Sequence, residues 1–184
     1  MAIHSDVNSL TIEAIEEYLD IARLCITNRK QDGGIYGYPA TLLLFSVINA
    51  IGTSQLACNE PFRVLKEKPF SCPLNDRQIK QLEQWYRNLL THNGMIAPGA
   101  CLTPEDGGEP FKFDRGEPII IRVKPLYNLV RDAWDRVDRA EVNAAWRPKK
   151  QHSIANPVDL SRATSCVSLT ASGSIHVPTV IPKK

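Results

Sequence analysis

The chain has 184 residues, 43% of them hydrophobic and 23% charged, with a formal net charge of +2. This composition excludes a wholly disordered protein, and at this length it predicts one buried core with appendages. The charge is uneven, since residues 1–146 sum to −3 and residues 147–184 to +5. We therefore predict a helical domain over 1–146 and a basic tail, rich in Ser, Pro and Thr, over 147–184.

The sequence gives no signal for export, a membrane or a metal cluster. Met1–Asn8 is mixed and polar, unlike the charged start and apolar run of a signal peptide. The most apolar run, Leu42–Ile51, is too short to span a bilayer. The 5 cysteines are widely spaced without a C-x-x-C pair, which argues against a disulfide framework or a zinc site. We expect a cytoplasmic protein that does not associate with a membrane and binds no metal or cofactor.

The first predicted helix runs from about Ser9 or Thr11 to Asn28. Its early acids and the later Arg29 and Lys30 suit the helix dipole. Helical spacing gives it one apolar face for the core and one acidic face for water. The expected core residues are Ile12, Ile15, Leu19, Ala22, Leu24 and Ile26, and the expected water-facing acids are Glu13, Glu16, Glu17 and Asp20.

The second predicted helix covers Ala40–Leu56, with Pro39 at its start. It is apolar on nearly every side, which is typical of a helix surrounded by others. Asn49 lies on a narrow polar strip of this helix. A buried Asn without partners costs about 1–3 kcal/mol, so Asn49 either bonds a neighbouring backbone group or lines a functional site.

A short hairpin is predicted after two irregular connections. Residues 58–74 are expected to hold a short helical element around Phe62–Lys68, and residues 95–108 to form a loop. Two apolar runs, at 111–113 and 119–123, then flank the turn-forming Asp-Arg-Gly-Glu, which predicts a β-hairpin.

The last predicted helix opens at Pro125, and the helical run extends up to Trp146. Pairs of opposite charge four residues apart, such as Arg131 with Asp135, indicate a solvated face. The expected core stripe is Leu126, Leu129, Val130, Ala133, Trp134, Val137 and Ala140.

A further helix, from about Asn75 to His92, carries the candidate site. Asn75 or Asp76 can cap its start, and Asn93-Gly94 provides a left-handed stop. Its apolar stripe is Ile79, Leu82, Tyr86, Leu89 and Leu90.

Several residues of this helix are predicted to point away from the core. With Ile79 at zero and about 100° per residue, Arg87 falls at about 80° and His92 at about 220°. Gln81, Trp85, Asn88 and His92 form a row at i, i+4, i+7 and i+11. Such a row, with a tryptophan in it, indicates a face that a second molecule or another helix covers.

Arg87, the polar Asn88 and His92 resemble the R-x4-6-H motif of the HEPN superfamily. The resemblance covers this motif and, loosely, the helical run up to Trp146. It implies a helical bundle that pairs as a homodimer, with two motifs facing each other and cleaving RNA without metal. Arg147 and His152 have a similar spacing, but they follow the last predicted helix and we treat them as a chance match.

The chemistry of RNA cleavage explains why two copies would be needed. Attack by the 2′-OH requires a base, an acid for the leaving 5′-oxygen, and positive charge on the phosphorane. One chain offers one motif histidine, whereas two chains offer two imidazoles and two guanidiniums. Arg suits this task because its planar fork bonds two phosphate oxygens at once.

We therefore predict a mainly α, up-and-down HEPN-like bundle with a small β-hairpin before the last helix and an irregular or hairpin-like tail. The leading function is metal-independent endoribonuclease, with Arg87 and His92 catalytic, and Asn88 and Asn49 supporting them. Gln81 and Trp85 are assigned to the dimer interface. The resemblance also implies a toxin or defence setting with a protein antitoxin or regulatory partner. The alternative is a catalytically silent helical module that binds a protein through the same face.

Overall fold

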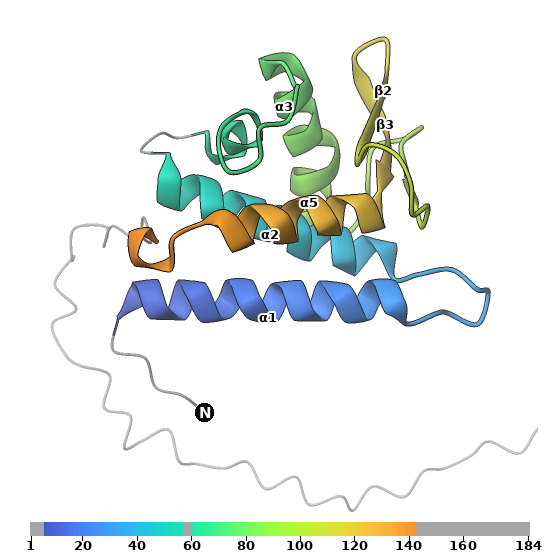
Figure 1. Ribbon diagram of the computed structural model, residues 1–184. Helices are drawn as coiled ribbons and strands as arrows, with labels where there is room; N and C mark the ends of the chain where they lie inside the picture. Colours follow the sequence, from blue (N-terminus) through green and yellow to red (C-terminus); the bar gives the residue numbers. More distant parts are fainter. Residues whose placement is uncertain (1–5, 57–59, 143–184) are drawn as a thin grey trace, which may run out of the picture. The chain divides into compact units, whose positions relative to one another are not determined.

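The computed structural model describes residues 6–56 and 60–142, all within the unit Met1–Trp146 (Figure 1). Its elements are α1 (Val7–Thr27), α2 (Gly37–Gln55), η1 (Pro61–Lys66), α3 (Asp76–Leu82), η2 (Glu83–Asn88), α4 (Leu89–Asn93), β1 (Cys101–Thr103), β2 (Phe111–Asp114), β3 (Glu117–Arg122), α5 (Val123–Arg136) and η3 (Arg139–Glu141). The predicted mainly α class is confirmed. The predictions made for 147–184, including the Arg147–His152 spacing, lie outside the described residues.

α1 begins and ends at local capping signals. The Asp6 side chain accepts a hydrogen bond from the Ser9 N–H at 2.8 Å, which satisfies a free donor of the first turn, and Asn28 follows the last turn. The helix therefore starts slightly earlier than predicted. It packs against α2 and α5 through its buried residues Ile15, Leu19 and Ala22 (Figure 1).

Two side chains of α1 do not lie where the sequence predicts. Leu24, expected in the core, is 51% exposed. Glu16, expected in water, accepts hydrogen bonds from Trp134 Nε1 at 2.6 Å and Arg131 Nη1 at 2.9 Å. Both differences have one cause. The periodicity of a helix shows that it has an apolar face, but not on which sides its neighbours pack.

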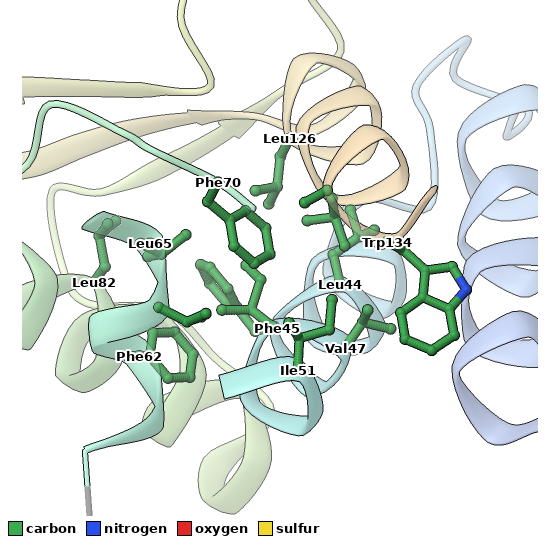
Figure 2. Close-up of a cluster of buried hydrophobic side chains, with 14 of the residues drawn as sticks. Leu44, Phe45, Val47, Ile51, Phe62, Leu65, Phe70, Leu82, Leu126 and Trp134 are labelled. Atoms are coloured by element: carbon green, nitrogen blue, oxygen red, sulfur yellow. The ribbon is translucent and has the colours of Figure 1, made fainter. Parts of the chain in front are cut away.

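α2 is the centre of the core, as its apolar sequence predicts. It contacts α1, η1 and α5, and Leu44, Phe45 and Ile48 are fully buried. Figure 2 shows Leu82 of α3 and Phe62 of η1 toward one end of this cluster and Trp134 of α5 at the other. The burial of apolar side chains on all sides of α2 is what holds the separate helices together.

The three-stranded sheet has the order β1-β3-β2. The hairpin of β2 and β3 is confirmed, and its two turn residues, Arg115 and Gly116, have φ values of 50° and 89°. Both central residues thus have the positive φ of a type I′ turn, which matches the twist of the strands. β1 was predicted to be loop. It pairs parallel to β3, a long-range contact that its own three residues do not signal.

Candidate functional site

The motif helix is the continuous helical run α3, η2 and α4. Its predicted start is confirmed, since the Asn75 side chain accepts from the Gln78 N–H while the Gln78 side chain accepts from the Asn75 N–H, both at 2.9 Å. Its predicted stop is confirmed too, because Gly94 has φ 65° and its N–H bonds the carbonyls of Leu89 and Leu90. The sequence therefore located the helix that carries the candidate residues correctly.

The middle of this helix, Glu83–Asn88, is a π-helical segment. Its hydrogen bonds span one residue more than those of an α-helix, so each turn is wider. The angular positions predicted at about 100° per residue therefore do not hold from Glu83 onward. π segments within α-helices occur often at functional sites, because they change the direction of the side chains that follow.

Tyr86 fixes this segment in the protein. Its side chain is fully buried, its ring meets Phe45 of α2 edge-on at a centroid distance of 6.3 Å, and its hydroxyl donates to the Pro118 carbonyl at 2.9 Å. Burial, with a smaller effect of Cys101, raises the pKa of Tyr86 above its ordinary value. The helix next to Arg87 is therefore held to the core and to the backbone of β3.

Arg87 and Asn88 are both half-buried and contact each other. Arg87 Nη1 donates to Asn88 Oδ1 at 2.8 Å, and Thr91 Oγ1 donates to the Arg87 carbonyl at 2.7 Å. The first bond restrains the guanidinium while leaving its other donors available, since a guanidinium carries five. Asn88 thus has the geometry of a residue that positions Arg87.

His92 lies in α4, the last turn of the helix, and is exposed. Free carbonyl groups and the negative end of the helix dipole lie at this position, and both attract positive charge. An exposed imidazole at a fixed helix end can meet an RNA backbone or a second protein chain. The structure therefore places Arg87 and His92 on one continuous, well-anchored helix.

The two predicted interface residues are less outward than α-helical geometry indicated. Trp85 is half-buried and packs against the core, and its carbonyl accepts from the Ala97 N–H at 3.0 Å. Gln81 is half-buried, and its Oε1 atom is buried without a hydrogen-bond partner among the described residues. Trp85 is less outward than predicted because other parts of the chain pack against it, and the angular position on its own helix does not show that. The interface role of these two residues stays a prediction.

Asn49 lies half-buried on α2, the helix against which η2 and α4 pack. The structure shows no hydrogen bond from its side chain to Arg87, Asn88 or His92, all of which lie in the described part. A role in supporting the motif therefore remains a prediction, without a hydrogen bond to the motif among the described residues.

No protein-family model matches the chain, and no curated protein or solved structure matches it. None of the helices in residues 6–56 and 60–142 is long and apolar enough to cross a membrane. The same residues hold no group of three His, Cys, Asp or Glu side chains placed to bind a metal ion.

Sequence reasoning missed the anchor of the site. The bond from Tyr86 to Pro118 joins residues 32 positions apart, which no local pattern can reveal. The apolar side chain of Trp85 outside the predicted stripe was a local hint that another part of the chain packs there.

Proposed function

We propose that the protein is a metal-independent, HEPN-like endoribonuclease that acts as a homodimer, with Arg87 and His92 as its catalytic residues. The observation that carries the proposal is the Arg87–Asn88 hydrogen bond of 2.8 Å on a helix that ends with an exposed histidine. A positioned guanidinium and a nearby helix-end imidazole are the groups that phosphate chemistry needs.

The reaction would proceed between two facing motifs. One His92 takes the proton of a ribose 2′-OH, and that oxygen attacks the adjacent phosphorus. The other His92 gives a proton to the 5′-oxygen as its bond to phosphorus breaks. The products are a 2′,3′-cyclic phosphate and a free 5′-hydroxyl. The two Arg87 side chains bind the phosphate oxygens, where negative charge grows in the transition state.

The remaining predicted residues have supporting roles in this proposal. Asn88 holds Arg87 in place, Gln81 and Trp85 line the contact between the two copies, and Asn49 supports the helix from α2. The proposal includes action in the cytoplasm, in a toxin or defence setting, with a protein partner that regulates the activity.

A test is RNA cleavage by the pure full-length protein in EDTA. We expect His92→Ala to lose at least about a hundredfold in rate, as for other removed proton-transfer groups. Arg87→Lys should be severely impaired as well, because an ammonium group lacks the two-pronged phosphate contact. Arg77→Lys is the matched control, since Arg77 is an exposed arginine of the same helix and is expected to leave the rate unchanged.

Equal activity of the wild type and His92→Ala would reveal a contaminating nuclease and end the proposal. The alternative is a silent module that binds a protein through this face. In that case Trp85→Ala should weaken association most, and no EDTA-resistant cleavage should occur. Trp85 already packs partly against the core of its own chain, and this reduces the support for an interface at this residue in both the dimer and the protein-binding module.

A further inference from the structure

A cavity of about 430 Å³ lies between the connection from η1 to α3, strand β2 and helix α5. Most of the side chains that line it are apolar, and the ones that matter most here are Phe70, Cys72, Glu109, Phe111, Phe113 and Leu129. Sites for small molecules have volumes of about 300–1,000 Å³ and mainly apolar linings with a few polar groups. The cavity therefore has the size and the composition of a small-molecule site.

The backbone on two sides of this cavity is fixed by hydrogen bonds. On one side, the Cys72 N–H donates to the Leu65 carbonyl of η1 at 2.7 Å. On the other side, the Arg122 N–H donates to the Pro110 carbonyl at 2.9 Å, which holds the start of β2 against the end of β3. A cavity whose walls are already ordered binds a ligand with a smaller loss of conformational entropy.

Three phenylalanine rings come together in the lining. Phe70 and Phe111 are only 5% and 8% exposed, and Phe113 is half-buried. Phe70 belongs to the buried cluster of Figure 2, so its ring is held by the core. Aromatic rings favour contact with another flat ring, and their faces also attract positive charge. The apolar part of the lining thus suits a ligand with a ring.

Glu109 is the only charged residue of the lining, all of which the structure describes. The nearby Arg122 bonds Glu105 through Nε at 2.7 Å and the Glu109 carbonyl through Nη1 at 2.9 Å. Within residues 6–56 and 60–142, the Glu109 carboxylate itself forms no ion pair. It is therefore available to a positive group that enters the cavity.

The Cys72 thiol shows that this carboxylate acts on the cavity. Burial, with a smaller effect of the Glu109 charge, raises the pKa of Cys72 to about 11. The thiol is therefore neutral at physiological pH and does not cancel or add to the charge of Glu109. The cavity has one negative charge at its edge and apolar walls behind it.

We propose that this cavity binds a small molecule that combines an apolar ring with a protonated amine, the ring lying among the phenylalanines and the ammonium group beside Glu109. An acidic ligand of the same shape is disfavoured, because its charge would meet the carboxylate. Gln78 lines the cavity at the start of the motif helix, whereas Arg87 and His92 lie toward its end. The inference does not rest on the proposed ribonuclease activity, and each can fail without the other.

The test titrates the full-length protein with 2-phenylethylamine and with phenylacetate, which carry opposite charges at a similar distance from the same ring. Chemical shifts of the backbone amides measure both the affinity and the place of binding. We expect the amine to bind with a Kd of about 1 mM or tighter and at least about fivefold more tightly than phenylacetate. The largest shifts should occur at Ser71, Cys72, Phe111 and Phe113, and the preference should shrink at high salt.

Charge variants separate a specific site from general attraction to the protein. Glu109→Gln should remove most of the preference for the amine, and Glu109→Lys should reverse it. Neither change should disturb the fold, because the side chain is exposed and Arg122 bonds the backbone carbonyl of Glu109. Glu117→Lys is the matched control, since Glu117 is an exposed carboxylate of the same hairpin outside the lining.

Three results would overturn the proposal. They are the absence of shifts at these amides with about 10 mM amine, equal affinity for the two ligands, and a preference that Glu109→Lys and Glu117→Lys change to the same extent. Phenylacetate binding more tightly than the amine would also overturn it.

Discussion

α1 and the motif helix show how differently two amphipathic helices can use the same sequence periodicity. α1 is regular from end to end, so its side chains point where α-helical angles place them. The motif helix widens into a π segment over Glu83–Asn88, so the directions of Trp85, Arg87 and His92 cannot be obtained by the same arithmetic. Periodicity locates a helix reliably, but it gives the directions of the side chains only where the helix is regular, and it does not show which side the neighbouring elements cover.

The largest stability difference is expected between two leucines of α1. Leu19→Ala removes a fully buried side chain and should lower the free energy of unfolding by about 3 kcal/mol. Leu24→Ala should change it by less than about 0.5 kcal/mol, because Leu24 is 51% exposed. Urea denaturation of both variants measures the contrast. Equal losses would mean that Leu24 belongs to the core, as the sequence alone predicted.

Gly52→Ala tests the packing of α2, the helix that contacts both regions. A Cβ at this position would fall 1.9 Å from the Pro61 carbonyl oxygen, so α2 and η1 would have to move apart. We expect a loss of about 2–3 kcal/mol from this overpacking, measured by thermal unfolding. Gly107→Ala is the control, since no atom lies within 4 Å of a Cβ there. Similar melting temperatures for the two variants would contradict the close approach.

Tyr86→Phe tests the anchor of the π segment. The change removes the donor of the buried 2.9 Å bond to the Pro118 carbonyl, which should cost about 1–2 kcal/mol. Amide hydrogen exchange over Glu83–Asn88 should increase as well. Tyr38→Phe, at a residue 47% exposed, is the matched control and should change neither quantity. Unchanged exchange in Tyr86→Phe would show that the segment is held by packing alone.

Glu16→Gln tests the polar contact between α1 and α5. Burial works to raise the pKa of Glu16, but hydrogen bonds from Trp134 and Arg131 and the charges of Arg131 and Arg139 outweigh it, so the pKa lies below its ordinary 4.5. A carboxyl group whose pKa is lower in the folded state stabilises the fold at pH values above its pKa in the unfolded state. That contribution is lost as the pH falls through the folded-state pKa. With this side chain 39% exposed, the contribution is about 1 kcal/mol or less.

The measurement is the difference in unfolding free energy between wild type and Glu16→Gln as a function of pH. The difference should be greatest near neutral pH and shrink below pH 4.5. Asp132→Asn, at an exposed carboxylate of α5, serves as the control. A pH-independent difference would mean that the Glu16 charge contributes nothing to the contact.

The sequence by itself determined the elements whose signals are local. Asn75 with Gln78, the Gly94 stop and the Arg115-Gly116 turn act within a few residues, because a cap or a tight turn depends only on its neighbours. The apolar character of α2 also predicted its central position, since no face of that helix suits water. For the candidate site, this local information sufficed to place Arg87, Asn88 and His92 on one helix with a defined end.

Only the tertiary structure decided which side chains meet. The parallel pairing of β1 with β3, the bond from Tyr86 to Pro118 and the three partners of Glu16 join segments far apart in the chain. Leu24 and Trp85 were misplaced for the same reason. Whether an apolar side chain is buried depends on where neighbouring elements pack and on whether the helix stays regular, and neither is encoded within a single turn.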